Sequence, residues 1–181
     1  MKKILLLVII LLLSTSLFGC MNGRSGSQVK EETQQADKID EETDSNVYQN
    51  TQYGFSFSLP ESWKGYTIVT DEWEGLAMGG SETIEIGPLI NIRHPQWTTA
   101  NPRQDIPIMI FTLSQWASMQ QAKFHIGAAP IGPSELGRNS RYVFALPARY
   151  NYAFPTGWEE VENILNSNPL QSNEDIKPVT Q

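Results

Sequence analysis

The residues of this 181-residue sequence that could support catalysis or metal binding are few and far apart. There are two histidines, His94 and His125, and one cysteine, and the HExxH pattern of zinc proteases is missing. A zinc site would need carboxylates such as Glu82 or Glu85 brought in by the fold. Patterns for a nucleophile elbow, a phosphate-binding loop and a dinucleotide fold are missing as well. We therefore expect no metal, no cofactor and no catalytic residue, and we interpret both histidines as structural.

Three carboxylates, Asp71, Glu72 and Glu74, surround Trp73 and raise the question of a glycosidase-like acid pair. In glycosidases the two carboxylates come from separate elements and stand about 5 to 10 Å apart. Three carboxylates within one short segment do not establish this separation between two elements. The sequence therefore favours the interpretation that they lie at the solvent-exposed end of a hairpin. An extracytoplasmic hydrolase built from dispersed Asp, Glu and His side chains stays the alternative function.

Arginines and aromatic residues around segment 149–154 are the best suited to hold a ligand. Tyrosine offers a flat apolar ring with a hydroxyl, and arginine offers a planar fork for a carboxylate, so a sugar, a peptide or a partner loop would fit. The candidate ligand surface consists of Arg141, Arg149, Tyr150, Tyr152 and Trp97. In the alternative interpretation, Tyr150, Tyr152 and Phe154 share one face of a strand and cover the sheet beneath a helix.

The amino terminus has the charge and length of a secretory signal peptide. Lys2 and Lys3 precede an aliphatic run, Ile4–Leu13, that is too short for a stable membrane span. The next residues, Leu-Phe-Gly-Cys at 17–20, resemble the lipobox of bacterial lipoproteins. This resemblance implies that residues 1–19 are removed and that a diacylglyceryl group on Cys20 anchors the chain to the extracytoplasmic face of the cell membrane. Ordinary secretion with an incidental Cys20 is the alternative.

Composition divides the remaining chain into three parts. Residues 20–46 lack aromatic side chains and carry three basic against seven acidic residues, so we expect a disordered acidic tether. Residues 47–170 hold all five tryptophans and form a single domain, and residues 171–181 form a polar tail. The formal charge of −7 and the lack of a basic cluster disfavour nucleic-acid binding.

Apolar alternation and apolar runs predict several strands in the domain. We expect strands at 55–59, 66–73, 83–93 and 141–146, the last of them inside a sheet. A break at Gly87-Pro88 is possible within the third strand. The continuous apolar run 108–111 fits either a central strand or the buried start of the next helix.

Capping patterns predict two helices. Thr112–Gln115 has the pattern of a capping box that opens an amphipathic helix, and 156–159 has the same pattern before a carboxyl-terminal helix that Asn168-Pro169 ends. The Gly- and Pro-rich residues 126–139 predict a loop with at most a short strand. These elements predict an α+β fold in which helices cover an antiparallel sheet.

The segment Tyr53-Gly-Phe-Ser-Phe-Ser-Leu-Pro-Glu-Ser-Trp-Lys-Gly-Tyr66 resembles the opening hairpin of PsbP-like domains, with the pattern Y-G-F-x-F-x-x-P-x-x-W. Residues 92–97 and 137–150 are similar to uncharacterised lipoproteins of Gram-positive bacteria. The resemblance implies an α/β/α sandwich and, by analogy with PsbP-like accessory and assembly factors, a non-catalytic binding or accessory role at the cell envelope. The expected partners are the membrane, through Cys20, and an envelope protein or cell-wall ligand.

Overall fold

The computed structural model describes residues 46–128 and 130–174, which all belong to one compact unit, Glu41–Gln181. The expected signal peptide, the lipidation site Cys20 and the tether up to residue 45 lie outside these residues, as does the end of the tail from residue 175. Among the described residues, no helix is long and apolar enough to cross a membrane.

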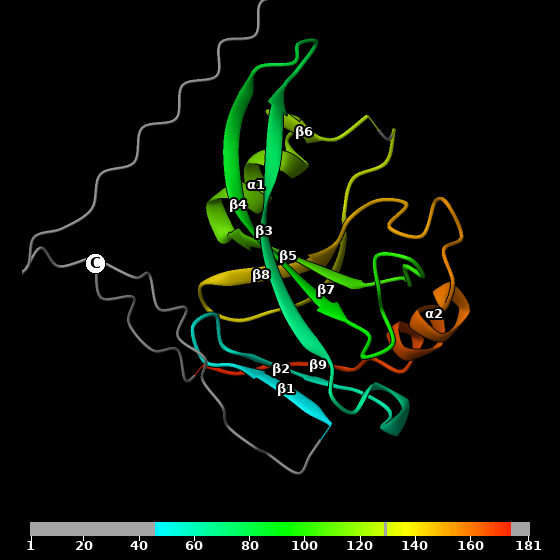
Figure 1. The fold of residues 1–181 in the computed structure, drawn as a ribbon. Coiled ribbons are helices and arrows are strands. Elements are labelled where there is room, and N and C mark those ends of the chain that lie inside the picture. The colour runs from blue at the N-terminus through cyan, green and yellow to red at the C-terminus, as the bar shows by residue number, and fades with distance from the viewer. Residues whose placement is uncertain (1–45, 129, 175–181) are drawn as a thin grey trace, which may run out of the picture. The chain divides into compact units, whose positions relative to one another are not determined.

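A six-stranded antiparallel sheet forms the centre of the domain (Figure 1). Its strand order is β6-β3-β4-β5-β8-β7. The strands are β3 Thr67–Ala77, β4 Thr83–Arg93, β5 Ile106–Thr112, β6 Phe124–Ile126, β7 Ser134–Arg138 and β8 Tyr142–Leu146. The strands predicted at 66–73, 83–93 and 141–146 are thus confirmed, and β8 lies between two neighbours as an inner strand does.

A second, three-stranded antiparallel sheet has the order β1-β2-β9. Its strands are β1 Val47–Asn50, β2 Phe55–Ser58 and β9 Leu170–Ser172. Phe55 and Phe57 of β2 are fully buried, as the alternation predicts, and Pro60 precedes a single turn of 3-10 helix, η1 Glu61–Trp63. Because β9 pairs with β2 through Ser172, the sheet extends two residues into the segment expected to be the tail.

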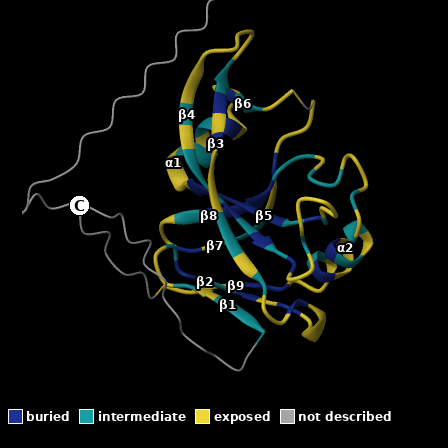
Figure 2. Cartoon of the chain, viewed as in Figure 1, coloured by how far each residue is buried: buried dark blue, intermediate teal, exposed yellow. Residues whose placement is uncertain are grey.

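Strand β5 resolves the ambiguity of the apolar run at 108–111. All but its last residue are buried, because β4 and β8 pair with its two edges and its two faces contact different cores. Ile106, Ile108 and Ile110 contribute to the first core, together with the small sheet and the carboxyl-terminal helix α2. Met109 and Phe111 contribute to the second core, beneath the other helix, α1 (Figure 2).

The two helices begin in different ways. Helix α1, Leu113–Gln120, has the predicted capping box: Thr112 Oγ1 accepts from the Gln115 backbone, and the Gln115 side chain accepts from the Thr112 backbone. Helix α2, Trp158–Asn166, has no such box. Its N-cap is Gly157 with a φ of 85°, without a side-chain cap hydrogen bond, so the capping box predicted at 156–159 is wrong.

The domain is therefore α+β with antiparallel sheets, in agreement with the predicted class. It differs from the expectation in what covers the main sheet. One face packs against the small sheet and α2, whereas α1 covers part of the other. The second sheet forms because the amino-terminal hairpin pairs with the last strand, a contact that no local pattern predicts.

Candidate functional site

Three segments that are far apart in the sequence meet beyond the end of β4: η1, the loop 95–105 and the first turn of α2. Ser62 Oγ donates to Glu160 Oε1 at 2.7 Å, across 98 positions of sequence. Nη2 of Arg103 donates to the other carboxylate oxygen, Oε2, at 3.3 Å. We call Ser62, Glu160 and Arg103 the polar bridge. Its three members come from three elements, so only the folded chain assembles it.

Packing of the neighbouring apolar residues positions the polar bridge. Trp63, only 1% exposed, fixes η1 against the first core, and Ser62 beside it faces α2. Val161 and Ile164 bury one side of α2, which leaves Glu160 at the junction between the helix and η1. The amphipathic pattern of α2 therefore sets the direction in which its carboxylate points.

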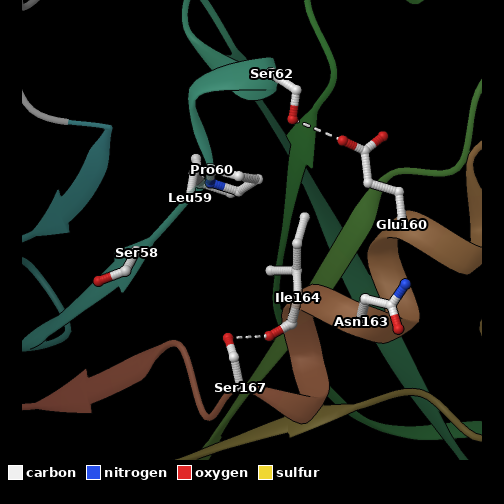
Figure 3. Close-up of a pocket in the computed structure, with 8 residues that line it drawn as sticks. All are labelled: Ser58, Leu59, Pro60, Ser62, Glu160, Asn163, Ile164 and Ser167. Carbon is white, nitrogen blue, oxygen red and sulfur yellow. Dashed lines mark hydrogen bonds between the residues drawn. The ribbon is translucent and has the colours of Figure 1, made fainter.

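A groove of about 510 Å³ lies on the α2 side of the polar bridge. Its lining residues are Ser58, Leu59, Pro60, Ser62, Glu160, Asn163, Ile164 and Ser167. Figure 3 shows Leu59 and Pro60 opposite Ile164, with the Ser62–Glu160 hydrogen bond at one end. The α2 groove thus combines an apolar floor with a polar rim, which is the usual make-up of a small-molecule site.

A recess of about 600 Å³ lies on the other side, between the loop 95–105 and the loop that precedes α2. Its lining residues are Gln96, Ala100, Asn101, Pro102, Arg103, Phe154, Pro155 and Thr156. The two loops are joined by the bridge pairing of Arg103 with Thr156 and by the Gln104 N–H, which donates to the Thr156 carbonyl at 2.8 Å. Phe154 is 65% exposed and offers an aromatic wall to a ligand in this Arg103 recess.

Arg103 is incompletely paired. Its Nε is buried and has no hydrogen-bond partner among the described residues, while Glu160 Oε1 accepts from Ser62. Arg93 is different, since Nε and Nη2 both reach the Asp105 carboxylate, at 3.1 and 2.7 Å. A guanidinium held by one contact of 3.3 Å keeps donor capacity for a further acceptor.

Gly157 makes room for Arg103. A Cβ at this position would stand 3.1 Å from Arg103 Nη2, and the left-handed φ of 85° also disfavours a side chain. Glycine therefore allows the guanidinium to lie against the turn that begins α2.

His94 is buried behind the polar bridge, only 3% exposed. Its Nδ1 accepts from the Gln96 backbone at 3.0 Å, its ring hydrogen-bonds to the Ser62 backbone, and it lies edge-on to Trp63 at 5.0 Å. Burial lowers the pKa of His94, the positive charge of Arg103 lowers it further, and Glu160 and the Ser62 backbone oppose the shift. The backbone engages the ring on both sides, so His94 acts as a neutral anchor and not as a base directed at the Ser62 hydroxyl.

The structure separates the residues of the candidate ligand surface predicted from the sequence. Arg141 precedes β8 and Arg149 follows it, so the two arginines flank opposite ends of a five-residue strand. Tyr150 is half-buried against the first core, whereas Tyr152 is 74% exposed. Trp97 lies in the loop 95–105, where the Arg93 guanidinium stacks over its ring at 3.9 Å.

Residues 148–153 form turns and not the strand that the alternation of Tyr150, Tyr152 and Phe154 suggests. Arg149 and Phe154 both have positive φ, 55° and 46°, which breaks an extended conformation. Hydrogen bonds of consecutive turns, Tyr152 N–H to the Arg149 carbonyl and Phe154 N–H to the Asn151 carbonyl, replace a strand ladder. The loop instead exposes Tyr152 and Phe154 to solvent, and Phe154 lines the Arg103 recess.

The other candidates from the sequence do not converge on a reaction centre. Asp71, Glu72 and Glu74 lie exposed on β3, and Glu74 accepts only a cross-strand hydrogen bond from Thr83. His125 contacts the Gly127 carbonyl through Nδ1 at 2.7 Å. Within residues 46–128 and 130–174, no three His, Cys, Asp or Glu side chains are grouped so that they could hold a metal ion.

Ser62, Arg103 and Glu160 were not singled out from the sequence. Each is an ordinary polar residue locally: a serine after a Pro-Glu turn, an arginine in a Pro-rich loop and the second glutamate of a helix start. Their association depends on tertiary contacts between distant elements. The one local signal is Gly157, whose position directly before a helix marks a place where a side chain has no room.

Comparisons with known proteins add no further information about the site. No protein-family model matches the chain. No curated protein and no solved structure matches it either.

Proposed function

We propose that this chain is a lipoprotein anchored through Cys20 at the extracytoplasmic face of the cell membrane, where its PsbP-like domain acts as a non-catalytic binding or accessory module. Its ligand is an envelope component that carries a carboxylate, held at the Arg103 recess. The observation that carries the proposal is the incompletely paired guanidinium of Arg103, which lines a recess with the exposed ring of Phe154.

The chemistry of the recess supports this ligand class. A carboxylate is the acceptor that best matches a guanidinium, and an aromatic ring beside it can pack against an apolar part of the ligand. Glu160 stands on the other side of Arg103 and limits the attraction to anions that approach from the recess. The exposed aromatic residues Tyr152 and Phe154, at 74% and 65%, suit the rim of a binding site.

The hydrolase alternative receives less support from the same residues. Ser62 donates its hydroxyl proton to Glu160, and the His94 ring is engaged by backbone groups on both sides. A serine hydrolase needs a histidine nitrogen directed at the nucleophile. The contacts of Ser62 and His94 therefore fit a structural role for both side chains.

The test measures binding of carboxylate-bearing cell-wall peptide fragments to the full chain in detergent by calorimetry. The same fragments with their carboxylates converted to amides are the ligand control. Arg103→Gln should weaken binding about 10- to 100-fold, the loss of a charge-assisted hydrogen bond. Arg138→Gln is the matched variant, since Arg138 pairs with Glu135 on the edge strand β7 and should leave binding unchanged.

Two results would overturn the proposal. One is equal binding of the free and amidated fragments, or equal binding by Arg103→Gln and the unchanged chain. The other is cleavage of the fragments by the unchanged chain, detected by mass spectrometry, because a non-catalytic module returns its ligand intact.

A further inference from the structure

The far part of the β3–β4 hairpin, residues 71–88, extends beyond β5, and we call it the arm. Strand β6 pairs with it on the β3 side only, at Gly75–Ala77. Strand β5 pairs with β4 only from Leu89 to Ile92. From Thr83 to Pro88, β4 has β3 on one side and no strand on the other in the part of the chain that the structure describes. Figure 1 shows this hairpin rising past the other strands of the sheet. The arm therefore has an open edge along β4.

The two faces of the arm differ. Trp73 and Gly75 of β3 face inward, where the ring of Phe124 from β6 packs against them. On the opposite face, Ile86 of β4 is 54% exposed, and Ile84, at the register irregularity near the tip of the hairpin, is 47% exposed. The apolar face of β4 that begins in the first core thus continues into solvent (Figure 2).

This continuation is unusual for one strand. Ile90 and Ile92 have the same orientation as Ile86, because side chains two positions apart share a face, and they are 3% and 0% exposed. The small sheet and α2 complete the core over Ile90 and Ile92. Contiguous exposed apolar residues of this kind mark interaction surfaces.

The arm is strongly acidic. It carries Asp71, Glu72, Glu74, Glu82 and Glu85 and no lysine or arginine, a formal −5 within 18 residues. None of these five carboxylates forms an ion pair with another described residue. Such a surface attracts a basic partner and repels an anionic bilayer.

The backbone of the open edge is accessible for strand pairing. The Ile86 carbonyl accepts from Gln115 Nε2 at 3.0 Å, which shows that it points away from β3. In an antiparallel strand the N–H and C=O of a residue point the same way, so Ile86 directs both backbone groups to the open edge. The register irregularity opposite Gly75 and Leu76 leaves Ile84 without a partner on β3. The Gln115 side chain from α1 occupies the Ile86 carbonyl, as side chains at protected edges do.

We propose that the arm binds a basic, extended segment of a partner protein, which pairs with Thr83–Gly87 as an additional strand. The partner's apolar side chains contact Ile84 and Ile86, and its lysines or arginines face the carboxylates of the arm. The arm combines an open strand edge, an uncovered apolar face and carboxylates without ion-pair partners among the described residues. Together these three features match a basic, extended segment better than any single feature would. Ile84 and Arg93, which ends β4 just before the loop 95–105, are nine positions apart along the strand, about 30 Å. The arm therefore acts independently of the Arg103 recess.

The test uses the full chain in detergent micelles and a labelled ten-residue peptide of alternating Lys and Val. We expect binding by fluorescence anisotropy that weakens as salt is raised, and slower amide hydrogen exchange within Thr83–Gly87. A block peptide of the same composition, with its five Lys before its five Val, and an alternating Glu–Val peptide should bind at least about tenfold more weakly. Arg103→Gln should bind the Lys–Val peptide normally, which separates this proposal from the one above.

Two variants locate the binding. Ile84→Lys, which reverses both the apolar contact and the charge, should weaken binding about tenfold or more. Ile131→Lys is the matched control, since Ile131 is an exposed isoleucine, at 59%, in a loop outside the arm. Ile86→Pro removes a backbone N–H that points to the open edge, and β4 already accepts Pro88 in the same orientation. It should also abolish the added strand.

The proposal is overturned if Ile84→Lys and Ile131→Lys bind the peptide equally, or if the exchange of Thr83–Gly87 does not slow. It is also overturned if the arm takes another occupant. Binding of anionic vesicles that Ile84→Lys abolishes would identify a membrane surface, and a dimer that the same variant dissociates would identify a second copy of the chain.

Discussion

Glu160 divides its carboxylate between two donors, Ser62 and Nη2 of Arg103, and the Nε of Arg103 has no partner among the described residues. Ser62 donates to Oε1 at 2.7 Å, and the guanidinium does not form the two-pronged contact that Arg93 forms with Asp105. A buried donor without a partner costs about 1 to 3 kcal/mol. A ligand that satisfies this donor would recover that free energy on binding.

Removing the Ser62 hydroxyl should therefore change ligand binding more than stability. In Ser62→Ala, Glu160 can pair with both Nε and Nη2 of Arg103, which offsets the lost hydrogen bond to within about 1 kcal/mol. The guanidinium then has less capacity for a ligand, and affinity for carboxylate fragments should fall several-fold. Urea denaturation measures the change in stability, and calorimetry measures the change in fragment affinity.

Ser81→Ala, at an exposed serine in the β3–β4 turn, is the control and should alter neither stability nor affinity. Tighter fragment binding by Ser62→Ala would contradict this account of Arg103.

His94 makes stability depend on pH with a defined sign. Its pKa is lowered in the folded protein, by burial first and then by Arg103, so the unfolded chain binds a proton more readily. Stability is thus complete above the unfolded pKa of about 6.5 and declines as pH falls from there through the folded pKa. Urea denaturation between pH 7.5 and 5 should show this decline. His94→Gln should flatten it, and His125→Gln should retain it because the surroundings of His94 remain intact. Equal slopes for both variants would assign the decline to other groups.

Local sequence patterns correctly predicted the elements that are stabilised by contacts between residues close in the sequence. The capping box of α1 involves Thr112 and Gln115 only, and the burial of β5 follows from its apolar run. The same kind of pattern failed at 156–159, because Thr156 pairs with the loop 95–105 and Gly157 becomes the N-cap. It also failed at 150–154, where positive φ at Arg149 and Phe154 turns the chain. The polar bridge depends on hydrogen bonds between residues that are 57 and 98 positions apart in the sequence. A repeat of apolar residues every two or four positions predicts strands and helices, but it cannot predict contacts over such separations.

The Gly87-Pro88 pair does not break β4, and the reason lies in the packing of the neighbouring strand. Gly87 stands opposite Trp73, and a Cβ there would lie 2.5 Å from the indole ring. The indole is held in place because its Nε1 donates to the Ile110 carbonyl at 2.8 Å and its ring stacks on Phe111. Glycine at 87 is therefore a packing requirement of the second core.

Gly87→Ala should destabilise the domain by about 1 to 3 kcal/mol, the cost of overpacking a filled core. Urea denaturation followed by tryptophan fluorescence measures this change, and a shift in the Trp73 environment should accompany it. Gly132→Ala is the matched control, since a Cβ at Gly132 meets no atom within 4 Å. A loss of stability no larger than that of Gly132→Ala would show that Trp73 moves aside freely.

Charge is distributed unevenly over the whole molecule. Residues 46–174 contain seven basic and twelve acidic side chains, and the arm alone holds five of the acidic ones. The net charge of the described domain thus equals that of the arm, and the other charged residues balance one another. Residues 20–46 add three basic and seven acidic side chains. An anionic membrane surface would repel both parts, so in the proposed lipoprotein only the acyl chains on Cys20 provide membrane affinity.

This charge distribution predicts where the chain is found when it carries no lipid. Each buried methylene contributes about 0.8 kcal/mol, and two or three acyl chains anchor a protein stably, whereas nothing in the acidic mature chain replaces them. The unchanged protein should be labelled by palmitate, remain in the membrane fraction and begin at Cys20 with an added acyl mass. Cys20→Ala should lose the label, and any variant chain found in the membrane fraction should still carry the uncleaved residues 1–19. Chain that has lost residues 1–19 should be found in the medium with an unchanged urea midpoint, because Cys20 lies 26 residues before the first described residue. A membrane-bound, palmitate-labelled Cys20→Ala chain would place the anchor elsewhere.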